Sequence, residues 1–182
     1  MNYDKTVVTD GYGELLRPLA LWAADVAERS LPLFEASAPD DRRPRDAIDA
    51  AREFGHGGRR TAQLRALGWA AHAASRDVDD PAAQSAARAA SLAASAAYTH
   101  LDVASVHQVR HVLGPAVYAA QARELACGGD RRVGDAEIAW AVEHALAAVR
   151  ELVGRAALVQ RGRGRFGELS AALHVGLLDP PE

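Results

Sequence analysis

Three histidines in the sequence have types and spacing that could hold a metal ion. His107 and His111 lie four residues apart, so on a helix both imidazoles face one side and could chelate one ion. His72, in another segment, could supply a third ligand, and Asp25 or Glu28 could add a carboxylate. No glutamate directly follows His107, as the zinc-protease motif His-Glu-x-x-His requires. The sequence favours a simpler interpretation, in which these side chains form a polar core that hydrogen-bonds across buried helix contacts.

A run of charges of both signs between residues 40 and 46 is the second candidate site. Its ordinary interpretation is a solvated turn in which acidic residues cap the following helix. Its functional interpretation is a knot of salt bridges that contacts a partner protein, since another surface can complement dense charge. The residues proposed for this partner contact are Asp41, Arg42, Arg43, Arg45 and Asp46.

The remaining chemical motifs are weaker, and we assign no catalytic residue. The arginines between Arg161 and Arg165 could touch phosphate, but no aromatic residue interleaves them before Phe166, which favours a solvated linker. Cys127 has no adjacent histidine in the sequence to activate it as a nucleophile. The Gly-x-Ser-x-Gly elbow and the Gly-x-x-x-x-Gly-Lys phosphate loop are both absent.

Composition limits the class of protein that must position these residues. The chain has 182 residues, 49% of them hydrophobic and 25% charged, which suits one ordinary folded domain. A net charge of -3 gives no general attraction to nucleic acid or to an anionic membrane. The single cysteine excludes an internal disulfide framework, and no signal peptide or membrane-spanning run is recognisable. We therefore expect a soluble cytoplasmic protein without a membrane or nucleic-acid partner.

Alanine, with 41 residues, predicts an all-α fold, because it has the best intrinsic helix propensity. Start signals predict helices from Pro18 with a restart at Pro32, from Pro44 to Phe54, from Thr61 to about residue 76, and from Pro81. The helix from Pro81 extends to about residue 113 with a break near residues 99–100, and a further helix runs from 115 to 126.

Another helix is predicted after Asp135 as its cap, with Leu146 facing inward and Glu137 on the charged face. We expect Trp22, Trp69 and Trp140 to wedge against the alanine-rich helices. The resulting single-domain bundle has five to seven helices. Its predicted parts are an N-terminal arm (1–14), the helical domain (15–160), and a basic linker with a short helical tail (161–182).

Four segments together resemble a known bacterial family. They are LWAADVAERSLPLFE at 21–35, DRRPRDAIDAAR at 41–52, AAHAA at 70–74 and HQVRHVLGPAVYA at 107–119. In this order they are similar to bacterial immunity proteins with an immunity-5-like helical domain. The resemblance implies a protein without catalytic activity that binds and neutralises a cognate toxin, so the expected partner is that toxin.

Two alternatives stay open at this point. The three histidines are similar to the metal-binding set of DinB-like helical-bundle enzymes, which would make the chain a metal-dependent enzyme with a divalent cofactor. The tryptophans could instead line a small-ligand or regulatory site. Stoichiometric metal that is lost on His107→Ala would favour the first alternative, and ligand-dependent tryptophan fluorescence the second. The sequence also leaves open whether the protein is a homo-oligomer.

Overall fold

The computed structural model describes the backbone of residues 5–99, 106–155 and 163–179, and the side chains of 13–99, 110–155 and 163–179. Within these ranges the chain forms nine α-helices and one short 3₁₀ helix, so the all-α prediction is confirmed and the predicted five to seven helices are too few. The helices are α1 (Lys5–Glu28), α2 (Leu31–Ser37), α3 (Arg43–Gly55), α4 (Ala62–Ala74), α5 (Pro81–Ser95), α6 (Val106–Ala126), α7 (Arg131–Glu143), α8 (Ala147–Arg155) and α9 (Gly164–Leu178), with the 3₁₀ helix at Ala96–Tyr98.

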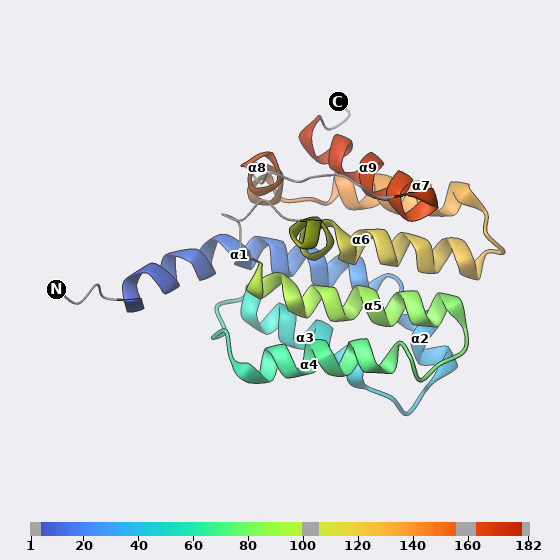
Figure 1. Cartoon of the computed structure of the whole chain (residues 1–182), viewed down its shortest axis with the longest axis horizontal. Coiled ribbons are helices and arrows are strands. Elements are labelled where there is room, and N and C mark those ends of the chain that lie inside the picture. The colour runs from blue at the N-terminus through green and yellow to red at the C-terminus, as the bar shows by residue number, and fades with distance from the viewer. Residues whose placement is uncertain (1–4, 100–105, 156–162, 180–182) are drawn as a thin grey trace.

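The helices are arranged around a central group of three, α1, α5 and α6 (Figure 1). Helices α2, α3 and α4 cover one side of this group, and α7, α8 and α9 cover the other. Helix α5 contacts α4 on one flank and α6 on the other, so it lies in the interior. No described helix is long and apolar enough to cross a membrane.

Small residues set the close spacing of α4, α5 and α6. Every alanine of α5 is buried, and a Cβ on Gly68 of α4 would lie 3.4 Å from the Ala94 Cβ. The Ser91 hydroxyl donates to the Gly68 carbonyl at 2.8 Å, which ties α5 to α4. On the other flank, a Cβ on Gly114 of α6 would lie only 2.6 Å from a Leu92 methyl group. Alanine and glycine thus let three helices approach closely, although they bury little area themselves.

Local start signals identify three helices correctly. Helix α3 begins beside Pro44 and ends at Gly55, as predicted. The Thr61 hydroxyl accepts from the Leu64 amide at 3.3 Å and caps α4. The Asp80 carboxylate accepts from the first amides of α5, and that helix ends at Ser95 before the predicted break. These caps act over two or three residues, so the sequence alone is sufficient to find them.

Two predicted helix starts are wrong. Pro18 lies inside α1, which begins at Lys5, and Pro115 lies inside α6. An interior proline removes a backbone hydrogen bond and strains the preceding turn. Here the residues on both sides of each proline are buried, Leu16 and Leu19 around Pro18 and Leu113 and Val117 around Pro115. Their packing holds each helix continuous through its proline.

The predicted course of the helix after Asp135 is also corrected. Asp130 is the cap of α7, where its carboxylate accepts from the Arg132 amide at 3.1 Å, and Asp135 lies inside the helix. The chain then leaves the helix at His144 and resumes as α8. Because this break changes the helical phase, Leu146 is exposed and does not face inward.

Candidate functional site

The carboxylates proposed for a metal site belong to an ion-pair network between α1, α2 and α3. Arg45 donates to Glu35 at 2.6 Å and to Glu28 at 3.2 Å. Arg52 donates to Glu28 at 2.8 Å and to Asp25 at 3.1 Å. The hydrogen bond from Arg45 holds the pKa of Glu35 below its ordinary value. Asp25 and Glu28 therefore bind arginines of α3.

The residues proposed for partner contact continue this network at the start of α3. Arg43 donates to Asp41 at 2.9 Å and to Asp77 at 2.8 Å. Arg42 and Asp46 form an exposed pair one helical turn apart, with 3.5 Å between nitrogen and oxygen. Hydrogen bonds from Arg43 hold the pKa of Asp41 below its ordinary value. Each of these charges has a partner of opposite sign within the chain.

The histidines lie elsewhere. His72 of α4 and His111 of α6 line the same pocket, so the structure brings two of the three predicted ligands together. The backbone of His107 belongs to α6, but its side chain lies outside the described residues. Neither Asp25 nor Glu28 lines this pocket. Within the part of the chain that the structure describes, no group of three metal-ligating side chains comes together, so the metal site stays a prediction.

This pocket, which we call the Trp69 pocket, is the candidate functional site. It has a volume of about 380 Å³ and is open to solvent on one side. Its aromatic wall is Trp69, which packs edge-on against His72 with 6.3 Å between the ring centroids. The lining residues are Arg65, Gly68, Trp69 and His72 of α4, Ser91, Leu92 and Ser95 of α5, Tyr98 after α5, and Arg110 and His111 of α6.

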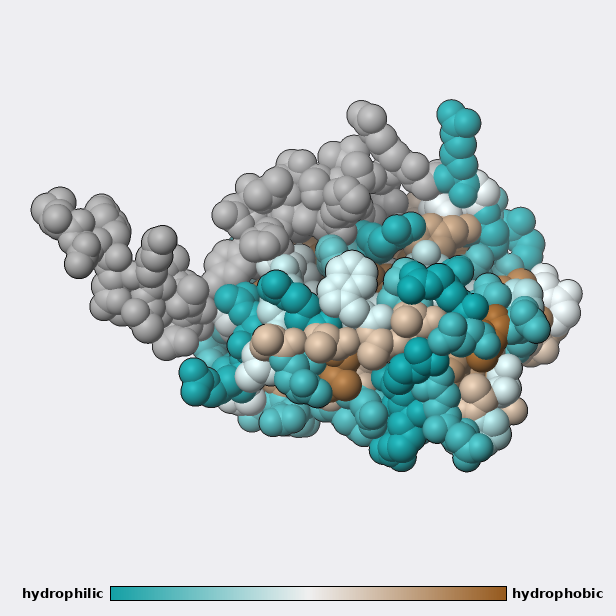
Figure 2. Space-filling view, turned by 60° about the horizontal axis from the view of Figure 1, so that its bottom comes forward, coloured by the Kyte–Doolittle hydropathy of each residue, from teal (hydrophilic) through white to brown (hydrophobic). Residues whose placement is uncertain are grey.

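Trp69 departs from the sequence prediction. The sequence predicts that it wedges against the alanine-rich helices, yet 69% of its surface is exposed, against 2% for Trp22. Helix α4 turns its buried residues, such as Leu64 and Ala71, towards the core and presents Trp69 from its outer face. Figure 2 shows a narrow band of apolar residues between hydrophilic ones on the side of the molecule formed by α3 and α4. A large aromatic side chain on such a surface is typical of a binding site.

Positive charge dominates the Trp69 pocket. Among the described lining residues there are two arginines and no carboxylate, and between Pro81 and Arg123 the sequence has a single acidic residue, Asp102, which lies outside the described residues. Burial, together with the charges of Arg76, Arg88 and Arg110, lowers the pKa of His72. The positive charges of these arginines repel a divalent cation and attract an anion. The pocket is therefore better suited to an anionic group.

Tyr98 holds Arg65, one of the two lining arginines, in place. The Arg65 guanidinium lies 4.5 Å from the centre of the Tyr98 ring, and Arg60 lies 5.7 Å from it. The Tyr98 hydroxyl donates to the Thr61 carbonyl at the start of α4. These contacts orient Arg65 before any ligand is bound, which lowers the entropic cost of binding.

Sequence reasoning missed two buried carboxylates on the opposite side of the molecule. Glu137, predicted to be exposed, is buried and accepts from Arg29 at 2.7 and 2.9 Å, and its carboxylate also lies 2.7 Å from Arg123. Arg29 in turn lies over the Trp140 ring at 4.1 Å. Glu137 lies three residues after Gly134 and four before Ala141, so it shares a helix face with these two buried residues. This spacing could have predicted from the sequence that Glu137 is buried.

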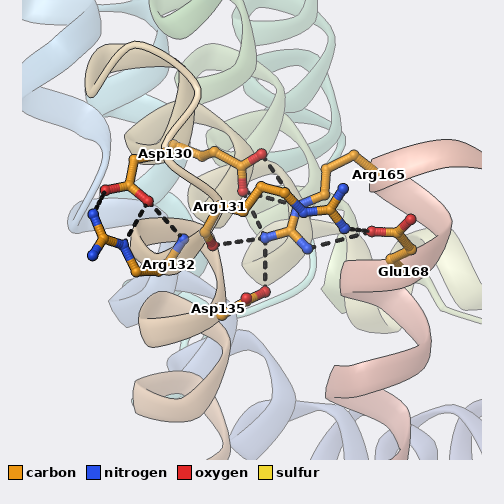
Figure 3. Close-up of polar contacts among 7 residues, drawn as sticks. Asp130, Arg131, Arg132, Asp135, Arg165 and Glu168 are labelled. Carbon is orange, nitrogen blue, oxygen red and sulfur yellow. Dashed lines mark hydrogen bonds and ion pairs between the residues drawn. The ribbon is translucent and has the colours of Figure 1, made fainter.

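The second missed carboxylate, Glu124, forms an ion pair with the C-terminal helix α9. Arg165 of α9 donates to Glu124 and to Asp135, both at 2.7 Å (Figure 3). Arg131 pairs with Glu168 beside them. Arg165 is therefore not part of a solvated linker, as the sequence suggested, but ties α9 to α6 and α7.

Comparison with known families matches residues 16–148 to the family described as "Imm-5 like putative immunity protein". The chain belongs to this family. The predicted resemblance to immunity-5-like proteins is thereby confirmed. No curated protein and no solved structure matches the chain.

The boundaries of the Imm-5 like domain separate the two candidate regions from the C-terminal helix. All residues that line the Trp69 pocket lie inside the matched range, as does the ion-pair network of α1, α2 and α3. Helix α9, with Arg165, lies beyond it and packs on α6 and α7. The pocket thus belongs to the immunity domain itself.

Proposed function

We propose that this Imm-5 like protein binds a cognate bacterial toxin in the cytoplasm and neutralises it by occupying the toxin's surface, without catalysis. The family match over residues 16–148 is the observation that carries the proposal. An obstructing binder needs a rigid surface, complementary charge and a few anchoring side chains. The tightly packed helices α4, α5 and α6, with Trp69 and Arg65 on their outer side, supply features of this kind.

Two surfaces are available for the toxin. The sequence pointed to the charge knot of Asp41, Arg42, Arg43, Arg45 and Asp46. These charges are already paired within the chain, so a partner would have to exchange existing ion pairs for new ones. This exchange gains little free energy, because exposed ion pairs contribute about 0–1 kcal/mol each. The knot remains a proposed contact, secondary to the Trp69 pocket.

The test is coexpression with candidate toxin domains, chosen from genes that neighbour this one. We expect cells that express both proteins to grow, and a catalytically inactive toxin variant to form a stable complex with the purified immunity protein. Calorimetry would give the Kd of that complex, and size exclusion would give its stoichiometry. The absence of both protection and a complex would contradict the proposal.

A metal-dependent enzyme is the second candidate function, favoured by the shared position of His72 and His111 in one pocket. His107 would have to complete the site. Elemental mass spectrometry of the tag-free protein, beside a His72→Ala/His111→Ala variant, tests this candidate. Stoichiometric zinc in the parent and its loss in the variant would favour the enzyme over the toxin binder.

A further inference from the structure

We infer that the Trp69 pocket receives an acidic segment of the partner protein, with a carboxylate facing Arg65 and Arg110 and an apolar side chain against Trp69. This inference rests on the proposed function and names the surface that the toxin would contact and the chemistry that would recognise it.

The first argument is uncompensated charge. Arg65, Arg76, Arg88 and Arg110 have no carboxylate partner among the described residues. From Gly55 to Arg76 the sequence contains no acidic residue at all. A segment with carboxylates would therefore form new ion pairs here without displacing old ones. Such pairs are worth most where binding excludes water from them.

The second argument is Trp69 itself. Its side chain is mostly exposed, whereas Trp22 is buried in the core and Trp140 is half-buried against His144 and Arg29. Exposing a large aromatic ring to water forgoes the free energy that its burial would provide. A partner recovers that free energy by covering the ring. Tryptophan and arginine are also the residues that most often anchor protein interfaces.

The shape of the pocket favours a protein segment over other anions. A volume of about 380 Å³ admits one or two side chains, and the open side leaves room for the backbone that carries them. A nucleic acid would bring many phosphates close to a chain whose net charge is -3. One or two carboxylates beside an apolar residue match the two lining arginines and the exposed ring.

The arrangement exists before binding. The Ser91 hydroxyl holds Gly68 of α4 against α5, and Tyr98 supports the Arg65 guanidinium. A partner therefore has little to reorganise on this side of the interface.

The first experiment uses a short peptide of alternating glutamate and leucine as the probe, followed by tryptophan fluorescence. We expect a saturable change with a Kd on the order of 0.1–1 mM, weak because a short peptide offers few contacts. Trp69→Phe should abolish the signal, since the other two tryptophans are shielded. Arg65→Glu should weaken binding about tenfold or more, corresponding to one charge-assisted contact.

The controls decide the chemistry. The matched variant is Arg163→Glu, because Arg163 is an exposed arginine outside the immunity domain and forms no ion pair with a described residue. It should bind the peptide like the parent. An equal response to a peptide with glutamine in place of glutamate, or an unchanged Kd in Arg65→Glu, would overturn the inference. Citrate that binds as tightly as the peptide would identify a small-anion site and would also overturn it.

The second experiment uses the inactive toxin and separates the inference from the proposed function. If the parent forms the complex, Arg65→Glu/Arg110→Glu should raise its Kd on the order of 100-fold, and Arg163→Glu should leave it within twofold. Thermal melts would verify that the variants are folded. A complex that tolerates the double reversal would overturn the inference and leave the proposed function intact. If the parent neither protects cells nor forms a complex, the proposed function fails, and the peptide titration alone decides whether the pocket binds an acidic segment.

Discussion

On the side of α1, α2 and α3, Arg45 and Arg52 each bind two carboxylates, whereas Arg65 and Arg110 on the side of α4, α5 and α6 bind none among the described residues. The first pair of arginines joins three helices that are separate in sequence. In the second pair, Arg65 lies against the Tyr98 ring, and Arg110 forms no ion pair with a described residue. Both are available to a partner. One residue type thus serves cohesion on one face and, in our proposal, recognition on the other.

The pKa directions agree with this difference. In the ion-pair network, neighbouring arginines lower the pKa of Glu35 and Asp41, because each positive charge stabilises a carboxylate. On the other face, burial and neighbouring arginines lower the pKa of His72, because there the positive charge destabilises an imidazolium. The positive field is neutralised locally in the first region and persists in the second.

The largest effect separates two tryptophans, one from each region. Trp22 of α1 is buried, and its indole donates to the Ala141 carbonyl at 2.9 Å. We expect Trp22→Ala to lower the free energy of unfolding by about 3–5 kcal/mol, the usual cost of truncating a buried aromatic residue. Trp69→Ala should change it by less than about 0.5 kcal/mol. Urea denaturation of both variants measures the contrast, and equal losses would contradict the exposed position of Trp69.

The next effect separates two pairs of arginines. Arg45→Ala/Arg52→Ala leaves Asp25, Glu28 and Glu35 without their partners, and we expect a loss of about 2 kcal/mol from four partly exposed ion pairs. Arg65→Ala/Arg110→Ala removes no ion pair with a described residue, but it removes the contact of Arg65 with the Tyr98 ring, and it should cost less than about 1 kcal/mol. Chemical denaturation at pH 7 compares the two. A larger loss of stability in the Arg65→Ala/Arg110→Ala variant would contradict the view that Arg45 and Arg52 hold the helices together while Arg65 and Arg110 do not.

A smaller effect depends on pH. Asp41→Asn keeps the backbone contact and removes the charge that pairs with Arg43, so we expect a loss of about 1 kcal/mol at neutral pH. Because the pKa of Asp41 is lowered in the folded state from its ordinary 3.8, its contribution is complete well above that pH and is lost as the pH falls below it. Unfolding of parent and variant between pH 7 and 2.5 should therefore converge in acid. A constant difference would contradict the ion pair.

The smallest effect is a dependence on salt. The stability difference between the parent and Arg45→Ala/Arg52→Ala should shrink by about 0.5 kcal/mol between 0.05 and 1 M NaCl, because salt screens partly exposed pairs. The variant without Arg65 and Arg110 should keep its difference from the parent in stability. Binding of the glutamate peptide by the parent should weaken over the same range, which distinguishes recognition by charge from recognition by the ring alone.

The sequence alone determined the features that depend on near neighbours. Alanine content and helical spacing predicted an all-α fold, and the caps at Thr61 and Asp80 located the starts of α4 and α5. A hydroxyl or carboxylate bonded to an amide two or three residues away acts within one turn, so it is legible without tertiary information. The family motifs are likewise runs of neighbouring residues, so the sequence alone is sufficient to recognise the family.

Only the tertiary structure decided which side chains of distant helices meet. Arg29 and Glu137 are 108 residues apart, and the tertiary fold brings the turn after α1 against α7 so that they meet. The same kind of packing placed His72 and His111 in one pocket, left Asp25 with Arg52, and kept α6 continuous through Pro115. A helix offers several faces with similar spacing, and burial of apolar surface by all helices together selects which face turns inward. The exposure of Trp69 follows from that selection, and no local signal specifies it.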